Sequence, residues 1–245
     1  LAPYSVRADG SVSGPGTDGK DLNGQVAFLV GGRHREEALV RLADGRDLSS
    51  SMRFEHPDDD NLDDRTVVRV ALPEPVPPGG SVTLDISFLA QLPQVFARTG
   101  YRHDFFLVGQ WFPKIGVYEP AGMRGRSTAG WNCHQFHATS EFYADYGEYD
   151  VDITLPSRFV VGATGRLAGQ VTKGADDVRY TYKQADIHDF AWTASPRFVQ
   201  LKRWFRANEQ VTPEEYAGVA ALLGRSLDEV KLGDIEVTLL LQPEH

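Results

Sequence analysis

The chain has 245 residues, and its 25 Lys and Arg against 34 Asp and Glu give a formal net charge of −9. This acidic balance argues against nucleic acid or an anionic membrane surface as a partner, because phosphate groups would repel the chain. Hydrophobic residues make up 41% of the sequence, which excludes a disordered chain, and no apolar run approaches the roughly 18 residues of a membrane span.

The first part of the chain is polar and rich in glycine. It begins with Leu1 and not with Met, as expected of a processed or recombinant piece. Residues 1–23 are predicted to form a loop or a frayed start, and residues 25–30 a short strand. Residues 58–64 include five aspartates. A calcium loop is conceivable there, but the ligand order of an EF-hand and its closing Glu are absent, which favours a solvated turn.

Alternation of apolar and polar residues predicts strands over most of the remaining chain. Residues 66–72 and 81–89 flank a stretch rich in Pro and Gly, so they are expected to pair as a hairpin with a long loop. Further strands are predicted at residues 149–155, 159–162, 178–182, 190–193, 198–205 and 235–241.

Only one region has helical features. Thr212 and Glu215 have the spacing of a capping box, Pro213 suits the first turn, and Gly224 is a natural end. Residues 226–229 repeat the capping-box pattern for a shorter turn. The predicted fold class is therefore all-β, with a small helical insertion near the C-terminus.

Motifs of self-contained enzymes are missing from the sequence. It has no G-x-S-x-G, no phosphate-binding loop and no H-E-x-x-H, and its single cysteine, Cys133, is interpreted as a small semi-buried residue. His134, His137 and Glu141 have the spacing H-x-x-H-x-x-x-E, which would place zinc ligands on one face of a helix. The segment does not have a helical pattern, and on a strand the two histidines would point to opposite faces. The favoured interpretation is a pair of hydrogen-bonded or surface histidines.

Aromatic and acidic residues are dense between residues 101 and 149. Many of the aromatics are expected in the core, with the interleaved acids in solvent. The alternative is that the acids, among them Asp104, Glu119 and Glu141, line a cleft that receives a cationic group such as a substrate ammonium.

Four separated motifs then suggest a family. They are FFLVGQWFPKIGVY at 105–118, EFYADYGEYDV at 141–151, FVVGATG at 159–165 and HDFAWTASPRF at 188–198. In this order they resemble the N-terminal domain of zinc aminopeptidases of the aminopeptidase N and leukotriene hydrolase type, in a bacterial branch of these gluzincins. The resemblance implies a saddle-like β-sandwich over residues 24–208, a helical insertion at 209–232, and a last strand at 233–245 that leads toward a catalytic domain.

The resemblance also implies what this chain lacks. In the family, zinc is held by H-E-x-x-H and a Glu eighteen residues further on, and G-x-M-E-N binds the free amino terminus of the substrate. None of these motifs occurs here. The expectation is a non-catalytic front domain, inactive alone and without a metal ligand. Its partners would be the catalytic domain of the same polypeptide and, through the whole enzyme, a peptide. Export to the periplasm or beyond is favoured over the cytoplasm.

One Gln or Glu of the family's N-terminal domain helps to hold the substrate ammonium, and two alignments place it differently here. Counting back from Phe112 and Pro113 gives Asp104, which is slightly favoured because a carboxylate pairs well with an ammonium. Counting back from Val151 gives Gln135. Glu141 is a third candidate by its charge. A different function, a free-standing β-sandwich module that binds peptide or carbohydrate on exposed aromatics, remains the alternative.

Overall fold

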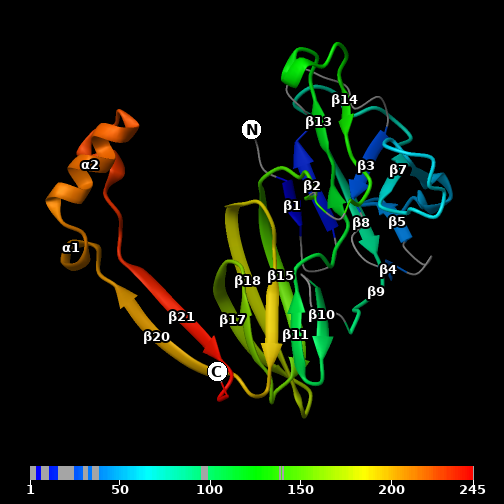
Figure 1. The fold of residues 1–245 in the computed structure, drawn as a ribbon. Helices are drawn as coiled ribbons and strands as arrows, with labels where there is room; N and C mark the ends of the chain where they lie inside the picture. The colour runs from blue at the N-terminus through cyan, green and yellow to red at the C-terminus, as the bar shows by residue number, and fades with distance from the viewer. Residues whose placement is uncertain are drawn as a thin grey trace. The chain divides into compact units, whose positions relative to one another are not determined.

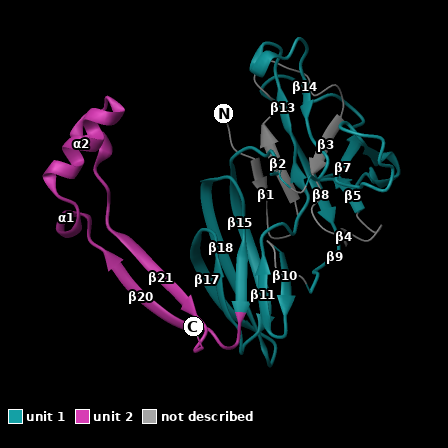
Figure 2. Cartoon of the chain, viewed as in Figure 1, with its two compact units in different colours: residues 1–194 teal, residues 195–245 magenta. Residues whose placement is uncertain are grey.

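The computed structural model describes residues 4–6, 11–15, 25–29, 33–34, 39–94, 99–137, 139 and 141–244. The chain divides into two compact units (Figure 2), which are residues 1–194, called unit 1, and residues 195–245, called unit 2. Strands dominate and the sheets are largely antiparallel, so the predicted all-β class is confirmed. The predicted strand at residues 198–205 groups with the helices of unit 2, whereas the sequence had placed it in a β domain reaching residue 208.

The largest sheet of unit 1 has seven strands (Figure 1). In spatial order they are β17 (Arg166–Lys173), β18 (Asp177–Ile187), β15 (Gly147–Pro156), β1 (Tyr4–Val6), β2 (Ser11–Pro15), β8 (Ser81–Ser87) and β5 (Leu39–Leu42). β1 pairs with β15 in parallel, whereas the other neighbours are antiparallel. The prediction of a loop over residues 1–23 is wrong where the structure describes this stretch, because β1 and β2 lie inside it.

Two four-stranded sheets and two strand pairs complete the β structure of unit 1. One sheet is β10 (Thr99–Arg102), β11 (Phe105–Val108), β19 (Trp192–Ser195) and β16 (Val160–Ala163); the other is β12 (Lys114–Ile115), β3 (Gln25–Leu29), β7 (Val67–Ala71) and β6 (Arg53–Glu55). The pairs are β13 (Val117–Glu119) with β14 (Gly130–Asn132), and β4 (Arg33–His34) with β9 (Ala90–Gln91). Short 3₁₀ turns η1 and η2 occupy Ser49–Ser51 and Met123–Gly125.

The predicted hairpin of residues 66–72 and 81–89 is wrong, although both strands exist. β7 pairs with β3 and β6, whereas β8 pairs with β2 and β5 in the large sheet. The Pro- and Gly-rich connection carries the chain from one sheet to the other, so the apolar faces of β7 and β8 meet in one core. Buried members of this core include Val68 and Val70 from β7 and Leu84 and Ile86 from β8.

A second core of unit 1 draws residues from all four sequence motifs. Its buried members are Phe112, Tyr149, Val151, Ile153, Phe159, Val161, Tyr182, Phe190 and Ala194. The rings interlock by offset and edge contacts, with Tyr149 5.9 Å from Phe112 and 6.0 Å from Phe190 between ring centroids. The motifs are therefore determinants of packing in this unit.

A buried ion pair ties the first motif to the last. The Lys114 ammonium contacts the Asp189 carboxylate, and the Lys114 side chain is 4% exposed. Gln110 Nε2 donates to the same Asp189 oxygen at 2.8 Å, and Trp111 Nε1 donates to the Phe190 carbonyl at 3.0 Å. Burial lowers the pKa of Lys114, and the charge and hydrogen bond of Asp189 oppose this shift.

Unit 2 is an antiparallel strand pair with helices between its strands. β20 (Val199–Phe205) pairs with β21 (Ile235–Leu241), and the connection holds α1 (Ala207–Gln210), α2 (Pro213–Leu223) and α3 (Leu227–Val230). Both predicted capping boxes are confirmed; Glu215 N–H donates to Thr212 Oγ1 at 3.2 Å, and Gly224 ends α2 with φ +61°. Among the described residues, no helix is both long and apolar enough to cross a membrane.

The β20–β21 pair, called the ribbon below, has one largely apolar face that Arg203 interrupts. Val199 faces Leu241, Leu201 faces Leu239, and Phe205 faces Ile235. Because strand side chains alternate, these residues and Val237 share one face. The aliphatic members of this apolar face are 38–49% exposed. The opposite face carries the ion pair of Lys202 with Glu236 together with Trp204, which is 50% exposed.

Replacing Lys114 by Met tests the buried ion pair. We expect unfolding in urea to require about 3 kcal/mol less free energy, because Asp189 keeps its charge and loses its buried partner. Lys183→Met is the matched control, since Lys183 also pairs with an aspartate, Asp150, but on the exposed sheet face. That change should cost less than about 1 kcal/mol. Equal losses for the two variants would contradict the role assigned to Lys114.

Candidate functional site

Asp104, the favoured candidate for binding a substrate ammonium, lies in the turn between β10 and β11. Its side chain is 59% exposed, and the Arg158 guanidinium lies 4.0 Å from its carboxylate. His103, just before it, has φ +52°, which gives the turn its tight reversal. The Arg158 guanidinium also lies over the Phe159 ring, 4.9 Å from its centroid. Its ion pair with Asp104 is therefore a weak one. The Asp104 carboxylate is thus presented to solvent.

Gln135, the second candidate, is buried and its amide is occupied. Its side chain lies in the segment after β14, and the residue is 3% exposed. The amide oxygen accepts the backbone N–H groups of Asp58 at 3.0 Å and Asp59 at 3.1 Å, and Nε2 donates to Asp59 Oδ1 at 2.8 Å. In this conformation Gln135 fastens the aspartate-rich loop and does not face solvent.

His134 and His137 meet at one carboxylate. His134 Nδ1 lies 2.7 Å from Asp58 Oδ1, and His137 Nε2 lies 3.1 Å from Asp58 Oδ2. The Gln135 backbone N–H donates to Asp58 Oδ2 at 2.6 Å. Burial would raise the pKa of Asp58, but the hydrogen bonds from His134, Gln135 and His137 outweigh it and hold the pKa below its usual range.

These contacts show whether the two histidines are metal ligands or hydrogen-bonded side chains. Residues 133–137 form no strand, so the condition under which the two histidines would point to opposite faces is not met. The interpretation as hydrogen-bonded histidines is confirmed. The negative charge of Glu141 acts to raise the pKa of Lys114. In the part of the chain that the structure describes, no group of three or more His, Cys, Asp or Glu could hold a metal ion.

Glu119 is a polar residue whose burial the sequence did not reveal. It ends β13 and its side chain is 1% exposed, so it is neither a solvated acid nor a cleft residue. Its Oε1 accepts from Arg124 at 3.2 Å and from the Tyr143 hydroxyl at 3.1 Å, and Arg126 lies 3.8 Å from Oε2. Arg124 sits at φ +46° over the Tyr143 ring. Glu119 thus anchors the turn between β13 and β14.

The remaining features of this region are structural. Cys133 is 8% exposed, and burial raises the pKa of its thiol to about 12, so the thiol stays neutral. A cavity of about 20 Å³, lined on one side by Phe112–Ile115 and on the other by Ala144, Asp145, Gly147 and Tyr149, has room for water only. Phe112, Tyr118 and Tyr149 are buried, whereas Phe136 and Tyr146 are at least 60% exposed.

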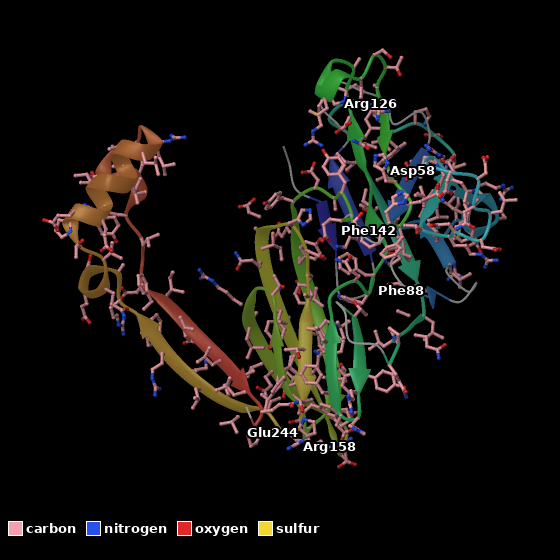
Figure 3. All side chains as sticks on the ribbon, viewed as in Figure 1. Asp58, Phe88, Arg126, Phe142, Arg158 and Glu244 are labelled. Atoms are coloured by element: carbon pink, nitrogen blue, oxygen red, sulfur yellow. The ribbon has the colours of Figure 1, made fainter. Side chains whose placement is uncertain are left out.

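The three candidates do not form one site. Figure 3 shows Asp58, the partner of Gln135, and Arg158, the neighbour of Asp104, at opposite ends of unit 1. Glu141 is exposed and acts electrostatically on Lys114. The aspartate loop was missed as the partner of Gln135 because 76 residues separate Asp59 from it; only the concentration of Asp and His residues hinted that they meet.

No protein-family model and no curated protein matches the chain. It is similar to solved structures of zinc metallopeptidases. One is the M1 zinc metallopeptidase from Deinococcus radiodurans, with 16% identity and a TM-score of 0.45, covering 82% of this chain and 41% of that one. A mutant of that enzyme bound to a Tyr-Ser-Ala substrate has 16% identity and a TM-score of 0.46, with 82% and 42% covered. The chain therefore spans about two fifths of the length of these proteins.

Replacing Gln135 by Ala tests its structural role. Two backbone N–H groups lose their acceptor, so the free energy of unfolding should fall by about 2–3 kcal/mol. Gln170→Ala on the exposed strand β17 is the control and should change it by less than about 0.5 kcal/mol. A Gln135→Ala chain as stable as the control would show that the amide is not needed to hold the loop.

Proposed function

We propose that the chain is the non-catalytic N-terminal domain of a zinc metallo-aminopeptidase, where it shapes the substrate cleft and helps to bind the free amino terminus of a peptide. The observation that carries this proposal is the set of four ordered motifs that resemble the family. Each of them contributes buried side chains to a single core of unit 1. Because the four motifs meet in one core, they support a domain fold shared with the family. Motifs lying far apart in the structure would not support it.

The ribbon supports the presence of a further domain. Two strands alone are marginally stable in water, so the ribbon is expected to pack against another part of the polypeptide. The aliphatic side chains of its apolar face are 38–49% exposed. In the proposal, the catalytic domain of the same polypeptide covers this face.

For the amino terminus of the substrate, Asp104 remains the preferred residue and Glu141 the second. Both are exposed carboxylates that suit an ammonium. Gln135 would first have to leave its bonds to the aspartate loop, which makes it the least suitable of the three.

The candidate ligands His134 and His137 do not suit zinc. His134 and His137 are engaged with Asp58, and the described residues offer no cluster of three ligands. In the proposal the metal belongs to the catalytic domain, where it would polarise the scissile carbonyl and activate water. Export from the cytoplasm stays a prediction.

The alternative is a free-standing β-sandwich that binds peptide or carbohydrate. The exposed Phe136 and Tyr146 favour it. Burial of Phe112, Tyr118 and Tyr149 speaks against a broad aromatic platform.

Reading the gene beyond the codon for His245 tests the proposal. We expect H-E-x-x-H with a Glu eighteen residues later and G-x-M-E-N upstream, and the whole polypeptide should hydrolyse aminoacyl-anilides in a chelator-sensitive way. The purified 245-residue chain should not hydrolyse them. A frame that stops within a few residues, or chelator-sensitive hydrolysis by the 245-residue chain alone, would overturn the proposal.

In the whole enzyme, Asp104→Ala should lower kcat/KM for aminoacyl substrates roughly 30- to 150-fold, because one ionic contact with the ammonium is lost. Asp176→Ala, which removes an exposed carboxylate from the turn between β17 and β18, serves as the control and should leave kcat/KM unchanged. If the Asp104→Ala enzyme turns over these substrates at the parental rate, another residue binds the substrate ammonium.

A further inference from the structure

The outer edge of β21 has the composition of a segment that pairs with other strands. Among the residues that the structure describes, β20 is the only strand that pairs with β21, so the other edge of β21 has no strand beside it. The seven residues of β21 hold a single charge, Glu236, and neither proline nor glycine. Short segments of this kind pair readily with another strand at an open edge.

The two edges of the ribbon differ in charge. β20 carries Lys202 and Arg203 next to each other near its middle. Cationic side chains on an edge strand discourage pairing with a further strand. Two β20 strands in antiparallel pairing over their full length would also bring Lys202 directly opposite its copy, which is destabilising. The ribbon therefore has one edge that is open to pairing, β21, and one that is protected, β20.

β21 is complementary to itself in antiparallel pairing. In the register that overlaps all seven residues, Thr238 lies opposite its copy, and Thr with Thr is a favourable cross-strand pair. Val237 then lies opposite Leu239 of the copy, and Glu236 lies opposite Leu240. No like charges face each other in this register. Because directly opposed residues share a face, the apolar faces of the two ribbons become continuous.

We propose that the free edge of β21 binds the same edge of a second copy of this chain, so that two ribbons form one antiparallel sheet in the order β20–β21–β21–β20. Two strands alone are marginally stable, and a sheet of three or more strands with an apolar face is more stable. Each copy contributes the same residues about a two-fold axis beside Thr238. Both outer edges of the combined sheet are β20, whose Lys202 and Arg203 stop growth at the dimer.

This contact goes beyond the proposed function and does not depend on it. The catalytic domain is proposed to cover the apolar face of the ribbon, whereas the second copy pairs with its edge. The dimer and its loss are measured with the 245-residue chain, in which no catalytic domain takes part. Failure of the dimer would therefore leave the proposed function as it stands.

Sedimentation velocity of the purified 245-residue chain measures the contact. We expect a reversible equilibrium between monomer and dimer, with the dimer clearly populated at about 50 µM chain. Hydrogen exchange locates the interface. As the dimer forms, the backbone amides on the outer edge of β21 should exchange more slowly, whereas those of β18 should not change.

Thr238→Glu separates pairing between copies from the fold of the ribbon. Within one chain, residue 238 faces Lys202, so a glutamate there forms a favourable cross-strand pair. Between copies, the same change brings two carboxylates together at the two-fold axis, and the dissociation constant of the dimer should rise at least about tenfold. Gln200→Glu is the matched control. It adds the same charge to the same face on β20, away from the axis, and should change the constant by less than about twofold.

A second variant tests the axis itself. Thr238→Lys chains should dimerise weakly alone and should form mixed dimers with Thr238→Glu chains, in which opposite charges meet. A wild-type chain that stays monomeric at the highest concentration would overturn the proposal. So would assembly beyond the dimer, which indicates that β21 pairs with β20 of the next copy. Dimerisation of Thr238→Glu as strong as that of Gln200→Glu would also overturn it, because the interface would then lie elsewhere.

Discussion

The buried contact between Lys114 and Asp189 is the constraint on which the second core of unit 1 depends. A buried charge without a partner is costly, so Lys114 and Asp189 must stay in contact. Their contact fixes the start of β12 against the chain just before β19. Gln110 and Trp111 add hydrogen bonds across the same junction. With this junction set, Phe112 and Phe190 both pack against Tyr149. Hydrophobic burial supplies most of the stability, and the ion pair selects this arrangement.

Local features of the fold were predictable from the sequence, and pairings over long distances were not. The strands at residues 149–155 and 235–241 follow from alternation, and the capping box at Thr212 follows from three neighbouring side chains. The partners of β7 and β8 could not be predicted, because alternation says which face is apolar but not which sheet a strand joins. β1 and β2 escaped prediction because glycine and polar residues hide their alternation.

The candidate site shows the same division. Exposure of Asp104 fits a polar turn, but burial of Gln135 and Glu119 depends on partners elsewhere in the chain. Glu119 is held by arginines five and seven residues further along the chain. They lie on a turn with left-handed backbone angles, which could not be predicted from the sequence. His134 and His137 share Asp58 in a segment that is neither a helix nor a strand, so the periodicity rules do not apply to it. Burial of a polar side chain is a property of the assembled fold.

The ribbon of unit 2 also has a consequence for how the protein is made. Both cores of unit 1 are complete once the chain has been synthesised through Ala194, so that unit can fold while the rest is still emerging from the ribosome. The ribbon emerges later, with Val199, Leu201 and their cross-strand neighbours exposed. Until that face is covered it is a surface to which other nascent chains and chaperones can adhere. A chain ended after β19 would keep both cores and lose this adhesive surface.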